Sequence, residues 1–177
     1  LKNVSFTALP GEIHAVLGEN GAGKSTMIAI AAGVLRPSAG AVTLKGRDVS
    51  EEGSRGRREA GISVAYQHPA LAPDLTVYEN LLLAAPALTG AEADDLIDSV
   101  ATPQLRMDKS RRVEELTLAQ LHVVEIARAL ATNPAVLILD EPTEPFQHDD
   151  IRKLFSLIKA LRARGVAIVY VSHRLHE

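Results

Sequence analysis

The sequence predicts an α/β fold built around a parallel β-sheet. Four short, almost wholly aliphatic runs lie along its 177 residues, at positions 13–17, 62–66, 136–139 and 166–171. Continuous apolar runs of this length are typical of strands buried on both faces of a sheet. Helical patterns alternate with the runs, which favours an α/β arrangement of roughly one domain.

Three of these helical patterns have clear bounds. Residues 24–34 follow a glycine-rich turn, and residues 119–131 place Val123, Ile126 and Leu130 on one stripe. Residues 149–164 begin with two aspartates, which suit a helix N-terminus, and end before Gly165, which suits a C-cap.

Two insertions interrupt the alternation. Residues 41–48 read as a short strand and turn, and together with residues 3–7 they predict a small antiparallel edge layer. Residues 71–118 contain no convincing strand, and helices are predicted at 76–84 and 91–100.

These insertions suggest a division of the chain. We expect an α/β core formed by residues 1–70 and 131–177, and a helical subdomain formed by residues 71–130.

Composition excludes several classes of protein. Nineteen Lys and Arg against 22 Asp and Glu give a net charge of −3, so nucleic acid is not an expected partner. The absence of cysteine excludes disulfides, thiol catalysis and thiolate metal sites. Uncharged stretches such as 80–91 are too short for a membrane helix, which needs ~20 apolar residues. The chain begins at Leu1 rather than Met, and we expect it to be partial.

Polar residues follow each aliphatic run at its carboxyl end. In open parallel sheets, ligands bind just outside the carboxyl ends of the strands. We therefore expect one binding edge formed by Gly18-Glu19-Asn20, Gln67-His68, Asp140-Glu141 and Ser172-His173.

The first of these segments fits the phosphate-loop pattern G-x-x-x-x-G-K-[ST] between a strand and a helix. Its residues are Gly18, Glu19, Asn20, Gly21, Ala22, Gly23, Lys24 and Ser25, with Thr26 following. Lys24 is expected to reach the β- and γ-phosphates, and the Ser25 hydroxyl to coordinate Mg²⁺. The alternative is a glycine-rich turn with a chance Lys-Ser. The strand–helix context favours a nucleoside triphosphate with Mg²⁺.

A second carboxylate site follows the run at 136–139. Asp140 suits water-mediated contact with the metal, and Glu141 suits a general base for an attacking water. The alternative is an ordinary acidic turn before Pro142.

In this order the motifs resemble the ATP-binding cassette of ABC transporters. Gln67 stands where that family has its Q-loop, Leu116-Thr117-Leu118-Ala119-Gln120 where it has its signature, and Ser172-His173-Arg174 where it has its switch histidine. The resemblance implies that Gln67 contacts Mg²⁺ or the lytic water, and that His173 contacts the γ-phosphate. It also implies that Thr117, Leu118, Ala119 and Gln120 act in trans on the nucleotide of a second cassette. For His173 the alternative is an ordinary surface histidine.

Within that family the chain looks most like the monosaccharide importer ATPases of the ribose, galactose and xylose type. Residues 18–26, 64–83, 124–130 and 165–175 carry the likeness. It implies ATP hydrolysis that energises sugar import, with two cassettes on one longer polypeptide. It further implies permease subunits bound through the helical subdomain and the Q-loop, at the cytoplasmic face of the cell membrane.

Three departures from the family leave alternatives open. Leu118 and Ala119 replace the signature glycines, residues 143–147 differ from the usual loop after the acidic pair, and the adenine-stacking aromatic is expected upstream of Leu1. A regulatory cassette with weak hydrolysis is one alternative. A soluble ABC protein acting on ribosomes or DNA is another, and the net charge of −3 argues against it.

Overall fold

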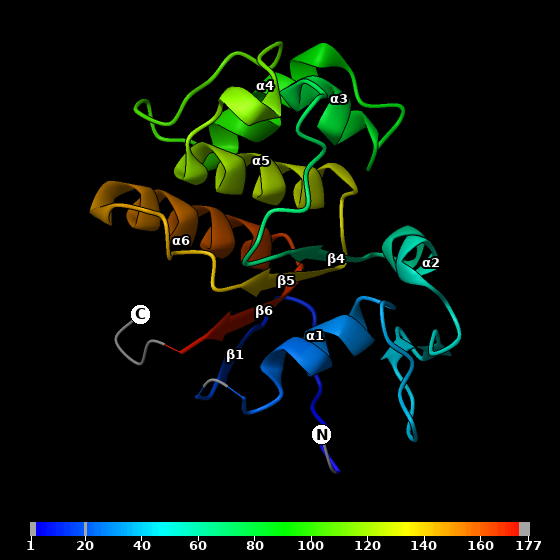
Figure 1. Cartoon of the computed structure of the whole chain (residues 1–177). Helices are drawn as coiled ribbons and strands as arrows, with labels where there is room; N and C mark the ends of the chain where they lie inside the picture. Colours follow the sequence, from blue (N-terminus) through cyan, green and yellow to red (C-terminus); the bar gives the residue numbers. More distant parts are fainter. Residues whose placement is uncertain (1–2, 20, 174–177) are drawn as a thin grey trace.

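A four-stranded parallel sheet forms the centre of the computed structural model, which describes residues 3–19 and 21–173 (Figure 1). The strands are ordered β1-β6-β5-β4. They span Ile13–Leu17 (β1), Ile62–Ala65 (β4), Val136–Asp140 (β5) and Ala167–Ser172 (β6). The predicted parallel sheet is confirmed, with each strand end within one residue of its predicted position.

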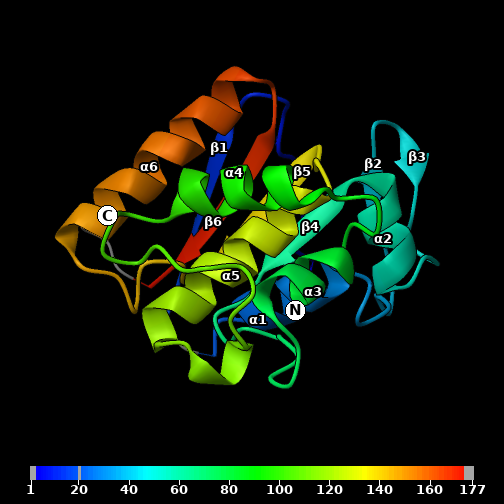
Figure 2. The ribbon, with the colours of Figure 1, turned by 90° about the horizontal axis from the view of Figure 1, so that it is seen from above.

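Helices cover both faces of this sheet (Figures 1 and 2). Helices α5 (Leu118–Ala131) and α6 (His148–Ala163) lie on one face, and α1 (Lys24–Ala31) lies on the other. Alternate residues of β5 point to opposite faces of the sheet. Leu139 packs in the core under α5 and α6, while Ile138 packs with Ile28 of α1 on the other face. This burial on both faces explains why the strands are continuously apolar.

Helices α3 (Val77–Leu82) and α4 (Gly90–Val100) stack on the outer side of α5, and a 3₁₀ turn at Val113–Glu115 leads back to it. Threonine N-caps with capping boxes begin α3, α4 and α5, namely Thr76, Thr89 and Thr117. These caps satisfy backbone N–H groups that otherwise have no partner in the helix. Helix α1 ends before the predicted residue 34, because the Val34 N–H bonds back to the Ala29 carbonyl at 2.9 Å.

The antiparallel layer is smaller than predicted. Strands β2 (Thr43–Leu44) and β3 (Arg47–Asp48) pair with each other, and α2 (Ser54–Ala60) follows them. The prediction that residues 3–7 join this layer is wrong, since they form no strand. The turn at Lys45 and Gly46 has φ of 50° and 79°, which folds the hairpin tightly on itself.

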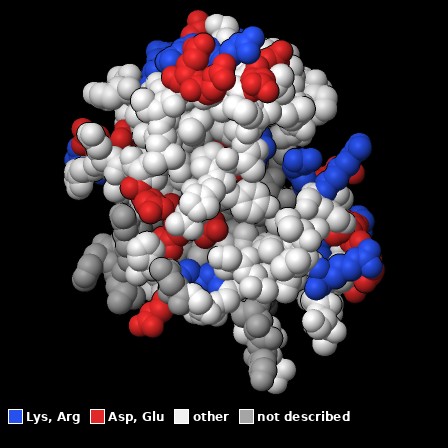
Figure 3. Space-filling view, viewed as in Figure 1, with Lys and Arg blue, Asp and Glu red and all other residues white. Residues whose placement is uncertain are grey.

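The surface carries both signs of charge. On the face seen in Figure 3, basic and acidic side chains are mixed over the region of α3 and α4. Within residues 3–19 and 21–173, no helix is both long and apolar enough to cross a bilayer.

Candidate functional site

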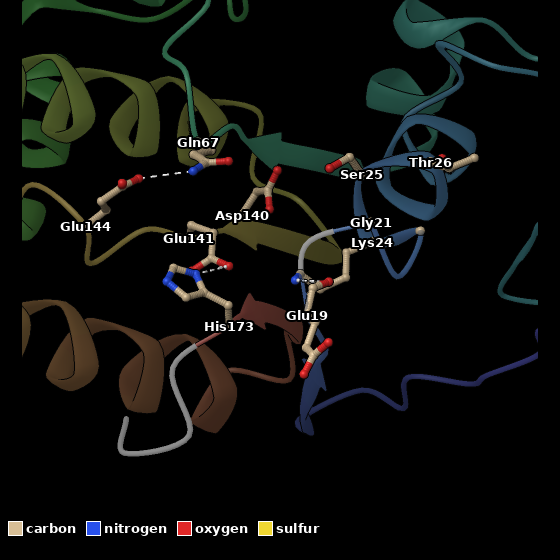
Figure 4. A pocket seen from close by; sticks show the side chains of 11 residues that line it. Glu19, Gly21, Lys24, Ser25, Thr26, Gln67, Asp140, Glu141, Glu144 and His173 are labelled. Carbon is tan, nitrogen blue, oxygen red and sulfur yellow. Dashed lines mark hydrogen bonds and ion pairs between the residues drawn. The ribbon is translucent and has the colours of Figure 1, made fainter.

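A cleft of about 570 Å³ opens at the carboxyl ends of the sheet strands (Figure 4). It brings together residues from all four polar segments that the sequence singled out. The lining residues are Glu19, Gly21, Gly23, Lys24, Ser25, Thr26, Gln67, Asp140, Glu141, Glu144 and His173.

The glycine-rich loop wraps around one end of this cleft. Gly21 and Gly23 have φ of 85° and 96°, a left-handed backbone that a side chain would strain. Gly23 is also the N-cap of α1, so the positive end of the helix dipole lies at the cleft. Gly18 and Ala22 belong to the loop without lining the cleft, and Asn20 lies outside the described residues.

Lys24 crosses the mouth of the loop. Its ammonium donates to the backbone carbonyl of Gly18, and to that of Glu19 at 3.3 Å. These bonds close the loop into a ring and hold a positive charge at the place where phosphate oxygens are expected.

Oxygen donors gather on the opposite wall. Burial and the neighbouring Glu141 raise the pKa of Asp140, while Lys24 acts in the other direction. The Gln67 amide nitrogen donates to Glu144 at 3.1 Å, and Figure 4 shows its oxygen on the side facing Asp140. Three hard oxygen ligands that fit Mg²⁺ line the cleft: the Ser25 hydroxyl, the Gln67 amide oxygen and the Asp140 carboxylate. Mg²⁺ usually takes few ligands from the protein and the others from substrate phosphates.

Glu141 and His173 form a pair in the floor of the cleft. The imidazole Nδ1 lies 2.8 Å from Glu141 Oε1, and the Glu141 side chain is 6% exposed. Glu141 has a φ of 47°, and its N–H bonds to the Val171 carbonyl at 2.9 Å. A non-glycine residue in this region of backbone space indicates local strain, which functional sites often hold. The carboxylate is therefore aimed by its backbone and by the imidazole.

Glu144 was not predicted as part of the site. In the sequence, residues 143–147 stand out only as a departure from the family pattern, although an acid so close to Glu141 is a usable signal. In the structure Glu144 adds a further carboxylate to the lining and binds Gln67.

The signature residues lie elsewhere, at the start of α5. Thr117 caps the helix and accepts the Gln120 N–H at 3.4 Å, while the Gln120 side chain accepts the Thr117 N–H at 3.1 Å. The Leu118 side chain projects from this end, and the residue is 61% exposed. None of residues 117–120 lines the cleft.

Comparison with known proteins agrees with this geometry. A family model described as "ABC transporter" matches residues 1–144. A ribose import ATP-binding protein of Streptomyces avermitilis, RbsA 2, is 42% identical over 184 residues, and the match covers 100% of this chain but 36% of that protein.

Solved structures extend the likeness to the fold. A dimeric bacterial ABC transporter cassette superposes with a TM-score of 0.88 at 28% identity, covering 99% of this chain and 81% of that one. A post-hydrolysis cassette dimer bound to ADP and Pi gives a TM-score of 0.87 at 27% identity, with the same coverage. The chain thus belongs to the ABC transporter family and has the fold of its nucleotide-binding cassettes.

Proposed function

We propose that the chain binds ATP with Mg²⁺, hydrolyses the nucleotide and thereby energises the import of a sugar. The observation that carries this proposal is the single cleft in which the Lys24 loop faces Asp140, Glu141 and the 2.8 Å Glu141–His173 contact. The Lys24 loop suits the oxygens of a polyphosphate, and the facing carboxylates suit one divalent cation bound to it.

In the proposed reaction, water attacks the γ-phosphorus, the bond to the ADP oxygen breaks, and ADP and phosphate leave. Glu141 orients the water and accepts its proton, since its buried carboxylate is held by His173. Lys24 stabilises the β- and γ-phosphate charge, and His173 adds a hydrogen bond to the γ-phosphate. Ser25, Asp140 and Gln67 hold the Mg²⁺, which when bound neutralises the charge on the phosphates.

The transport role rests on the relatives. The chain spans 36% of the length of a ribose import ATP-binding protein, so the activity of the whole protein is part of the proposal. We place a second cassette head to tail against this one, with Thr117, Leu118, Ala119 and Gln120 meeting its nucleotide. Residues 71–130 act as the helical subdomain and, with Gln67, contact transmembrane permease subunits at the cytoplasmic face of the membrane.

Replacing Glu141 tests the hydrolytic part. Glu141→Gln keeps the shape of the side chain and removes the base, so steady-state hydrolysis is expected to fall at least ~100-fold while ATP still binds. Glu59→Gln is the control, because Glu59 forms an exposed pair with Arg55 on α2. Unchanged hydrolysis in Glu141→Gln contradicts the proposed role of Glu141. Uptake of [¹⁴C]ribose by cells tests separately whether the transported substrate is this sugar.

A regulatory cassette with weak hydrolysis is the second candidate. The observation that favours it is the 61% exposed Leu118 at the tip of α5, where a bulky side chain can hold a partner's phosphate away from the backbone. Single-turnover assays on the full-length protein, with Glu141 or its counterpart in a second cassette removed in turn, separate the candidates. Fast turnover at the site that α5 completes excludes the regulatory reading.

A further inference from the structure

Helix α5 carries a buried carboxylate that the proposed chemistry does not use. Glu125 is 1% exposed. It accepts the Tyr66 backbone N–H at 3.3 Å. The Ala70 backbone N–H also acts to lower its pKa. Those two amides flank Gln67, so one side chain interacts with both ends of the short segment that presents the glutamine.

Arg128 completes the arrangement one helical turn later. Its Nη2 donates to both Glu125 oxygens, at 2.9 and 2.8 Å, and its Nη1 donates to the Ala70 carbonyl at 2.8 Å. The guanidinium thus binds the carboxylate and the far end of the segment together. We call Glu125 and Arg128, with their bonds to residues 66–70, the Q-segment clamp.

Burial makes this clamp costly to break. Desolvation raises the pKa of Glu125, and Arg128 and the two backbone hydrogen bonds act against that rise. Removing one member of a buried ion pair leaves the other charge without compensation, whereas exposed pairs contribute little. The Arg152–Asp149 pair on α6 is an example of such an exposed pair.

The clamp joins two parts of the proposed machinery. Thr117 begins the helix on which Glu125 lies, eight residues away, which corresponds to a rigid rod of about 12 Å. Gln67, between the clamped ends, lines the cleft and contacts Glu144.

We propose that Glu125 and Arg128 are positioning residues for Gln67. They fix the 66–70 segment to α5, so that displacement of the helix start by a second cassette is transmitted to the glutamine in the cleft. The predicted effect on ATP hydrolysis rests on the proposed function. The predicted attachment of the 66–70 segment to α5 rests on the hydrogen bonds alone.

A double-mutant cycle tests the kinetic consequence in the full-length protein. Glu125→Gln is expected to lower kcat for ATP hydrolysis about tenfold and to change KM for ATP less than about threefold. In a Gln67→Ala background the same substitution is expected to have no further effect, because coupled residues are not additive. Asp149→Asn, which removes an exposed ion pair, is the control and leaves kcat unchanged. Additive losses in the double variant, or an unchanged kcat in Gln67→Ala alone, overturn the proposal.

Amide hydrogen exchange tests the clamp without ATP. Glu125→Gln is expected to accelerate exchange at Tyr66 and Ala70 at least about tenfold, whereas Asp149→Asn has no effect there. Unchanged exchange refutes the clamp even if the protein hydrolyses ATP. Accelerated exchange in a protein without ATPase activity refutes the proposed function and retains the clamp. Should Glu125→Gln not fold, Arg128→Lys gives the same readout, since a single amine cannot hold Glu125 and Ala70 with the same fork of donors.

Discussion

The N-cap of α5 offers a way to separate stability from action on a second cassette. Thr117 accepts the Gln120 N–H at 3.4 Å, and Thr89 accepts the Glu92 N–H at 3.3 Å in an equivalent capping box on α4. Replacing a threonine N-cap by alanine costs about 1 kcal/mol, which is roughly 2–4 °C in Tm for a domain of this size. Thr117→Ala is therefore expected to destabilise the protein by about 1 kcal/mol.

Thr89→Ala is the matched control. Its capping box is tighter, since the Thr89 N–H and hydroxyl both reach Glu92 within 2.8 Å, compared with 3.1 and 3.3 Å to Gln120. Its loss of stability should equal or exceed that of Thr117→Ala.

Urea unfolding and steady-state hydrolysis, measured on both variants, give the answer. We expect hydrolysis to fall at least about tenfold in Thr117→Ala alone, because only this hydroxyl is proposed to meet a second cassette's nucleotide. Equal losses of hydrolysis in the two variants refute a role of Thr117 beyond capping.

Three further predictions concern charge and packing. Because the pKa of Glu125 is raised, the folded state holds a proton on this carboxyl at pH values where the unfolded state has already lost it. The free energy of unfolding of the wild type should therefore fall, relative to that of Glu125→Gln, as the pH rises above 4.5. Urea titrations between about pH 4.5 and 8 measure this difference. Asp140→Asn removes a half-buried charge beside Glu141 and should raise Tm while abolishing Mg²⁺-dependent hydrolysis; a lowered Tm contradicts the reasoning. Ile158→Ala on α6, where the side chain is 2% exposed, should cost about 2–5 kcal/mol, and Ile13→Ala at 40% exposure clearly less, with equal losses counting against the assigned core.

The elements themselves were largely predictable. Each strand of the sheet is an aliphatic run, and each of the α3, α4 and α5 helices begins at a threonine three residues before Glu or Gln. These signals are local, because periodicity and capping involve residues within one or two turns of each other. The prediction that residues 3–7 join the antiparallel layer was wrong, because no local sequence signal indicates which segment a strand pairs with.

The site was predictable only in part. Position at the end of a buried strand singled out Gln67, Asp140, Glu141 and His173, and all four line the cleft. Glu144 was missed although it closely follows Glu141, and its partner Gln67 lies 77 positions away. The clamp residue Glu125 was missed because its partner Tyr66 lies 59 positions away. No spacing rule connects residues so far apart.

The sequence by itself determined the parallel sheet, the glycine loop and the order of the motifs, because strand and loop formation follow from nearby residues. The tertiary structure decided which side chains meet. The strand order β1-β6-β5-β4 places the end of β6 beside that of β5, so that His173 reaches Glu141, and it leaves β4 at the edge, where α5 packs and Glu125 holds the segment around Gln67. Burial then gives these contacts their energetic weight, since a carboxylate removed from water must find its partners within the fold.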